Sequence, residues 1–322
     1  MAALADPAPV RVLELRSVDV ESLSTVLGEQ ISAWKAELDW DFRPSADLVR
    51  RFMQVHVLTG YALVLQADPT QVTGYAYYVC EEGKGLVGDL YILKQYRNGE
   101  QENALLQATL DAMWRTPGVR RIESQLLMLS DPPNRRLPYP HLFRSFPRLF
   151  LEAPSSARLP ARKPSPPMSI VPWTEAWQEA TGRLIAGAYR NHIDSQINDQ
   201  YRSAVGARRF LTNIVQYPGC GSFFAPASFA AVAAGALCGV SLASLVSPDV
   251  GHITQVCVAP TYQGTGLGYE LVRTSMEALA VRGCRAVSLT VTAANESALR
   301  LYRNMGFATR RAFSAFVWER SP

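Results

Sequence analysis

Residues 255–272, QVCVAPTYQGTGLGYELV, decide the fold of this chain. A short apolar run is followed by a glycine-rich turn and a long helical pattern, which predicts strand, loop and helix. Gly266 and Gly268 have no Cβ, so a bulky anion can approach the backbone closely there. The amides at the start of the helix point at such an anion, and the helix dipole favours its negative charge. The stretch therefore predicts a phosphate-binding loop.

The spacing of the glycines excludes two common nucleotide-binding loops. A dinucleotide fingerprint needs G-x-G-x-x-G, but Gly264 and Gly266 are followed by Tyr269 where the third glycine belongs. No Gly-Lys-Ser/Thr sequence follows, so the loop is not a Walker loop either. The loop therefore belongs to another class of phosphate-binding site.

The spacing Gln263-x-x-Gly266-x-Gly268 instead resembles the Q/R-x-x-G-x-G/A loop of the GNAT acyltransferase superfamily, which holds the pyrophosphate of acetyl-CoA. Residues 295–307, NESALRLYRNMGF, are similar to the family's N-x-x-A-x-x-L-Y-x-x-x-G-F helix and lie at the right distance. Together the two matches cover most of the second half of the chain. The resemblance implies an α/β fold (α+β, mixed sheet), in which a mostly antiparallel sheet is flanked by helices.

The first half of the chain repeats the element order of the second half. Tyr96 and Tyr262 are 166 positions apart, and apolar residues around them match at the same spacing. This pattern predicts an internal duplication of domain size rather than a solenoid, whose period would be about 20–50 residues. We therefore expect two tandem domains of the same fold. They are a degenerate first domain at 1–155, a proline-rich linker at 156–168 and a second domain at 169–322.

The first copy differs at its loop. Glu100 stands where Gly266 stands in the second copy, and Glu102 stands where Gly268 stands. Two bulky carboxylates would crowd and repel a pyrophosphate at close range. The counterpart of the 295–307 helix is replaced by a proline-rich segment. The first domain is therefore expected not to bind CoA but to pack on the second domain and wall its acceptor cleft.

The resemblance also implies the roles of single residues. Tyr302 matches the tyrosine that protonates the CoA thiolate, although a tyrosine here can also pack the helix against the sheet. The Val256 amide lies near the thioester oxygen as a donor to the oxyanion. Asn295 contacts CoA, caps its helix, or does both. The implied CoA-binding residues are Val256, Cys257, Val258, Gln263, Gly264, Thr265, Gly266, Leu267, Gly268 and Asn295.

The general base is a separate question. Several family members have a glutamate eleven positions before the glutamine or arginine of the loop, and here that position is His252. Strand alternation predicts that His252 shares a face with Val256, and an imidazole can accept a proton at neutral pH. The alternative is a structural histidine at the start of the strand. His192 and Asp194 lie in a polar stretch that the family uses for the acceptor, unless it is an ordinary capped loop.

The composition narrows the class of protein. Hydrophobic residues make up 48% of the 322 residues and charged residues 19%, which is typical of a globular protein. The net charge of +4 and the lack of a basic tract predict no nucleic-acid partner. Five scattered cysteines without C-x-x-C predict neither a disulfide framework nor a metal site. The N-terminus lacks secretory features, and glycines and serines break the apolar run at 229–246, so a cytoplasmic protein without a membrane span is expected.

The sequence thus predicts an acetyl-CoA-dependent N-acetyltransferase that acts on a primary amine, in a small molecule or a peptide, at a site in the second domain. Two alternatives stay open. One is a non-catalytic protein that binds or senses acyl-CoA. The other is acetylation of an aminosugar–cysteine conjugate, as by mycothiol synthase, which only the tandem layout supports. No motif identifies the acceptor, the preferred acyl chain or the oligomeric state.

Overall fold

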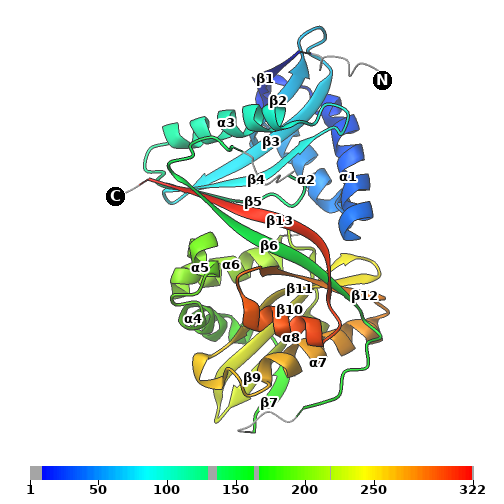
Figure 1. Ribbon diagram of the computed structural model, residues 1–322, viewed down its shortest axis with the longest axis vertical. Helices are drawn as coiled ribbons and strands as arrows, with labels where there is room; N and C mark the ends of the chain where they lie inside the picture. Colours follow the sequence, from blue (N-terminus) through cyan, green and yellow to red (C-terminus); the bar gives the residue numbers. More distant parts are fainter. Residues whose placement is uncertain (1–8, 130–135, 163–166, 218, 321–322) are drawn as a thin grey trace. The chain divides into compact units, whose positions relative to one another are not determined.

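The computed structural model describes residues 9–129, 136–162, 167–217 and 219–320 of the chain. The N-terminal segment 1–8 and residues 163–166 of the predicted linker lie outside this part. The chain forms two compact units (Figure 1). Unit 1 consists of Met1–Ala36, Phe42–Phe146 and Phe313–Pro322, and unit 2 consists of Glu37–Asp41 and Pro147–Ala312.

Unit 1 begins with a run of strands and helices from the first half of the chain. They are β1 (Val10–Glu14), α1 (Ser24–Leu38), α2 (Arg43–Gln54), β2 (Thr59–Leu65), β3 (Val72–Glu81), β4 (Lys84–Ile92), α3 (Gly99–Arg115) and β5 (Arg121–Gln125). Strands β1 to β4 pair antiparallel in order, and β5 lies parallel to β4. The apolar face of α3, which includes Leu105, Leu106 and Leu110, is fully buried against this sheet.

Unit 2 repeats this order. Its elements are β7 (Ser169–Pro172), α4 (Gln178–Ala188), α5 (Asp194–Ile197), α6 (Ala204–Gln216), β8 (Ser222–Phe223), β9 (Phe229–Ala233), β10 (Ala236–Ser247), β11 (Val250–Val258), α7 (Leu267–Arg282), β12 (Ala286–Thr292) and α8 (Glu296–Asn304). Strands β7, β9, β10 and β11 pair antiparallel, and β12 lies parallel to β11. The bounds of β4 and β11 differ by 166 positions at both ends, which is the predicted repeat spacing.

Helices cover both faces of the sheet in unit 2 (Figure 1). On one face α7 buries Val272, Met276 and Leu279 in a cluster with residues of β11 and β12. On the other face α4 and α6 pack against β10 and β11 in a second cluster. Full burial of each aliphatic side chain contributes about 1.5–3 kcal/mol, so these two clusters hold β11 firmly between the helices.

The two units exchange their last strands. Strand β6 (Phe143–Pro154) comes from the first half of the chain but pairs antiparallel with β12 of unit 2. Strand β13 (Ala308–Glu319) follows α8 but pairs antiparallel with β5 of unit 1, where Trp318 is fully buried. The chain therefore passes from one unit to the other within these strands, between residues 146 and 147 and between residues 312 and 313. The sequence pattern instead predicts a boundary at 156–168.

Among the residues that the structure describes, no helix is both long enough and apolar enough to cross a bilayer.

Candidate active site

A β-bulge in β11 determines which of its side chains share a face. Gln255 pairs with Leu242 of β10, and the next pair joins Ile253 to Ala243, so Thr254 is an extra residue on β11. One extra residue reverses the alternation of side chains beyond it. Accordingly, Ile253 and Val256 both pack in the cluster around α7, whereas Cys257 packs in the cluster around α4 and α6.

The bulge overturns the predicted face of His252. Without the extra residue His252 would share a face with Val256, but with it the two side chains lie on opposite faces. The imidazole is 6% exposed and packs against the rings of Trp40 and Phe150, at centroid distances of 5.1 and 5.8 Å. Its Nδ1 lies 2.9 Å from the hydroxyl of Ser288. Burial lowers the pKa of His252 to about 3, so the ring is neutral at physiological pH.

We expect His252 to make the protein less stable in acid. In the unfolded chain its pKa returns to about 6.5, so between pH 6.5 and 3 the unfolded state binds more protons than the folded state. Stability should therefore fall as the pH decreases through this window, by up to about 1.4 kcal/mol per pH unit. Melting temperatures of the protein and of His252→Asn, taken from pH 7.5 to 5, measure the effect.

The variant should lose this part of the pH dependence. Asp89 in unit 1 provides an opposing contribution, because burial raises its pKa to about 6 and stability is then lost as the pH rises toward that value. This contribution is the same in both proteins and cancels in the comparison. Equal pH slopes for the two proteins would contradict the assigned state of His252.

A cavity of about 760 Å³ opens within unit 2 where β11 and β12 separate. Pairing between these parallel strands ends at Ile253 and Leu289, although both strands continue beyond these residues. The cavity is lined by the diverging strand ends, by the glycine-rich loop and by α8. His252 is not among the residues that line it. Backbone groups of β11 beyond Ile253 are thus freed from pairing with β12.

The glycine-rich loop has the backbone that the sequence predicts. Gly264 and Gly266 have φ values of 76° and 87°, in the left-handed region where a side chain is strained. Gly266 is the N-cap of α7, and no side chain caps this helix end. The first amides of α7 are therefore left for a ligand, as an anion site requires. Gln263, Gly264, Gly266 and Gly268 all line the cavity.

Two other residues predicted to contact the cofactor turn their side chains elsewhere. The Thr265 hydroxyl donates to the carbonyl of Tyr262 at 2.7 Å. Leu267 is fully buried and packs in the core with Leu271. Neither lines the cavity, so only their backbone groups are available to a ligand of the loop.

The first copy has the same loop frame but a different helix end. Arg97 donates from Nε and Nη2 to the carbonyl of Ile92 at 3.1 and 2.8 Å, as Gln263 donates to the carbonyl of Val258 at 3.3 Å. The N-terminus of α3, however, is capped by its own Asn98, whose side chain accepts from an amide of the first turn at 2.9 Å. The first copy therefore satisfies internally a donor that the second copy leaves open.

Tyr302 projects from α8 to the wall of the same cavity. It is 9% exposed, and its ring packs edge-on against Phe307 at 5.8 Å. Burial, assisted by the negative charge of Asp194, raises the pKa of Tyr302 above its ordinary value. The phenol is therefore protonated at neutral pH. Packing and exposure to the cavity occur together, so both predicted roles of Tyr302 are compatible.

His192, Asp194 and Asn295 lie together at the edge of the cavity. The Nδ1 atom of His192 accepts from the backbone amide of Asp194 at 3.1 Å, and its Nε2 lies 3.3 Å from the Nδ2 atom of Asn295. The Asp194 carboxylate accepts a hydrogen bond from the hydroxyl of Thr292. Asn295 also caps α8, because its Oδ1 accepts from the amide of Ala298 at 3.2 Å. The polar loop is thus bonded to the end of β12 and lies beside the start of the Tyr302 helix.

The site includes contacts and residues that sequence reasoning missed. Gln255 donates to the hydroxyl of Tyr189 at 2.9 Å and accepts from the hydroxyl of Tyr201 at 3.3 Å, which ties β11 to the segments around α4 and α5. Arg148 and Arg162 also line the cavity. Arg148 comes from β6, the exchanged strand, so no motif within residues 169–322 could have indicated it.

Comparison with known families and proteins adds to this geometry. The family model described as "Acetyltransferase (GNAT) family" matches residues 191–307. A mycothiol acetyltransferase of Thermomonospora curvata is 41% identical over 78 residues, which are 24% of this chain and 26% of that protein. The N-alpha-acetyltransferase MAK3 of Arabidopsis thaliana is 37% identical over 57 residues, 18% of this chain and 30% of that protein. The matches thus span less than a third of these curated relatives.

Solved structures match over nearly the whole chain. A GCN5-related N-acetyltransferase from Sphaerobacter thermophilus has a TM-score of 0.66 at 18% identity, over 99% of this chain and 98% of that one. A tandem GNAT protein from the clavulanic acid biosynthesis pathway has a TM-score of 0.65 at 16% identity, over 98% and 99%. This similarity of fold confirms the predicted mixed sheet flanked by helices and the tandem arrangement.

Proposed function

The chain carries an acetyltransferase domain of the GNAT family at residues 191–307, and from this premise we propose that it transfers an acetyl group from acetyl-CoA to a primary amine. The active site in this proposal is the cavity of unit 2. One observation carries the proposal. One cavity of about 760 Å³ is lined by the glycine loop at the uncapped start of α7, by the end of β11 that does not pair with β12, and by Tyr302.

Each part of the cavity suits one part of the donor. The amides after Gly266 suit the pyrophosphate, because they provide unpaired N–H groups and the positive end of a helix. The backbone of residues 256–258 suits the thioester arm, since β12 does not pair with it. The Val256 amide in this segment is the proposed donor to the oxyanion. Asn295 is proposed to approach the donor from the N-terminus of α8, in addition to capping that helix.

The proposed reaction moves two protons. The amine nitrogen attacks the thioester carbon, the carbon–sulfur bond breaks, and the departing thiolate takes the phenolic proton of Tyr302. The phenol is protonated at neutral pH, and solvent restores its proton after each turnover. We assign the proton of the amine to His192, whose imidazole lines the cavity, in place of His252, which does not. Because the Asp194 amide donates to Nδ1, that nitrogen holds the lone pair of the ring. The proton of the amine is taken there, where a carboxylate oxygen of Asp194 lies 3.7 Å away.

In this proposal the two copies have different tasks. Residues 169–322 carry the acetyl-CoA site, with Arg148 contributed by β6, and residues 1–155 carry the degenerate copy. The capped start of α3 and its acidic first turn support a first copy that does not bind CoA. The proposed location is the cytoplasm.

Titration calorimetry with acetyl-CoA tests the proposal. We expect one binding site per chain, followed by release of CoA thiol when a suitable amine is added. Two equal sites would reject the account of the first copy, and absence of binding would reject the proposal itself. Binding without thiol release across a broad amine panel would favour the alternative of a protein that binds or senses acyl-CoA.

A second candidate acceptor is favoured by the curated relatives. Mycothiol acetyltransferases of several bacteria match this chain, for example one of Paenarthrobacter aurescens at 42% identity over 60 residues. The match covers 19% of each chain, so it supports the family more strongly than it supports this acceptor. Acetylation of an aminosugar–cysteine conjugate is therefore included in the amine panel as a direct test.

A further inference from the structure

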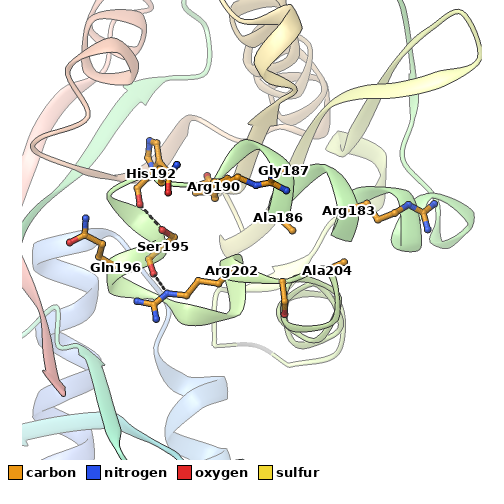
Figure 2. Close-up of a pocket in the computed structure, with 12 residues that line it drawn as sticks. Arg183, Ala186, Gly187, Arg190, His192, Ser195, Gln196, Arg202 and Ala204 are labelled. Atoms are coloured by element: carbon orange, nitrogen blue, oxygen red, sulfur yellow. Dashed lines mark hydrogen bonds between the residues drawn. The ribbon is translucent and has the colours of Figure 1, made fainter. Parts of the chain in front are cut away.

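A second cavity of about 630 Å³ adjoins the proposed active site within unit 2 (Figure 2). It lies between the C-terminal half of α4, the turn that follows it, α5, and the start of α6. Tyr189 and His192 line both cavities. A molecule seated in the second cavity can therefore reach the imidazole that faces the first. The volume is that of a site for a small molecule.

The second cavity is electropositive. Arg183, Arg190 and Arg202 line it, and its lining among the described residues contains no aspartate or glutamate. Helix α6 begins at its wall with Ala204, so the positive end of that helix dipole adds to the charge. Arg183 has an exposed partner in Glu179 at 3.1 Å, and such a pair contributes little in water.

Arg202 is held at the cavity wall. Its Nε donates to the carbonyl of Ser195 at 2.8 Å, and the Ser195 hydroxyl donates to the carbonyl of His192 at 2.7 Å. Figure 2 shows this chain of bonds from His192 through Ser195 to Arg202. A guanidinium bound through Nε keeps two terminal nitrogens, a fork that matches the two oxygens of a carboxylate or phosphate. The cavity thus has positively charged side chains beside His192, and one of them, Arg202, is held in place by a hydrogen bond.

We propose that the second cavity binds an anionic group of the acetyl acceptor, so that the acceptor is a small amine that also carries a carboxylate or a phosphate. This inference rests on the proposed function. The anion binds between Arg190 and Arg202, and the amine of the same molecule reaches past His192 toward the thioester. An amine without an anionic group gains nothing from the arginines and is repelled by them while it is protonated.

The first arm of the test measures anion binding without turnover. Protein saturated with acetyl-CoA, which fills the glycine loop, is titrated with inorganic phosphate by calorimetry. We expect binding that weakens at least about tenfold in Arg190→Gln/Arg202→Gln, since this double variant loses the charge-assisted hydrogen bonds to the anion. The control is Arg208→Gln, an arginine of α6 that pairs with Glu179 at 2.9 Å and does not line the cavity. It should bind phosphate normally.

The second arm compares matched amines that differ only in the anion. The first pair, glutamate and the amide of glutamine, tests a carboxylate. The second pair, glucosamine 6-phosphate and glucosamine, tests a phosphate. The anionic member of one pair should have a kcat/KM at least about tenfold higher than its neutral partner, because its KM is lower. The double variant should lose this preference. Absence of phosphate binding, an equal loss in Arg208→Gln, or equal use of charged and neutral amines would overturn the inference. Failure of the proposed function is seen separately, as absence of acetyl-CoA binding in the unmodified protein.

Discussion

Gly266→Glu is expected to abolish acetyl-CoA binding while the protein stays folded. Gly266 caps α7 in the left-handed region, with φ 87°, and nothing lies within 4 Å of where a Cβ would be. A side chain therefore fits in space but costs about 1–2 kcal/mol of backbone strain. The carboxylate would stand at the helix end that the pyrophosphate needs and would repel it. We expect a loss of affinity of at least about 100-fold, measured by calorimetry.

A matched variant separates charge from shape. Gly266→Gln has the same size and the same backbone strain as Gly266→Glu but no charge, so it should keep part of the affinity. Equal losses for the two variants would show that repulsion is not the cause. The comparison also bears on the first copy, where Glu100 occupies the corresponding position naturally and Asn98 caps the helix. Thermal melts of both variants confirm that the protein remains folded.

The sequence predicted the glycine loop and the Tyr302 helix because both depend on local requirements. A left-handed φ favours glycine, and an N-cap favours a residue such as Asn295, so these positions are visible in the sequence itself. The duplication was visible for the same reason, since the spacing of apolar residues repeats. Elements of this kind carry their own signal, independent of what they pack against.

Two features carried no such signal. The exchange of β6 and β13 depends on which distant strands pair, and Pro147 within β6 interrupts a regular strand pattern. The bulge at Thr254 inserts one residue, and a single residue is enough to move every following side chain to the other face. The predicted position of His252 was wrong for that reason. The arginines of the second cavity come from separate elements, so only the fold brings them together.

Tyr302→Phe is expected to lower kcat by about 100-fold or more, which is the usual range for loss of a general acid. Acetyl-CoA affinity should change little, because the change removes one oxygen and keeps the ring packed against Phe307. In the variant the thiolate must leave without the phenolic proton, so a donor with a less basic thiol should narrow the difference from the unmodified protein. This rescue distinguishes proton donation from a loss of packing, which would slow all donors alike.

The control for this prediction is Tyr262→Phe. Tyr262 lines the same cavity beside the glycine loop, but it lies on the segment before α7 rather than on α8. Removing its hydroxyl should leave kcat within about threefold, since it donates no proton in the proposed reaction. Steady-state kinetics with the best amine of the panel, together with calorimetry for acetyl-CoA, measure both variants. An unchanged kcat in Tyr302→Phe would remove the phenol from the mechanism. The pKa of Tyr302, raised by burial and by the charge of Asp194, would then reflect its position in the wall of the cavity alone.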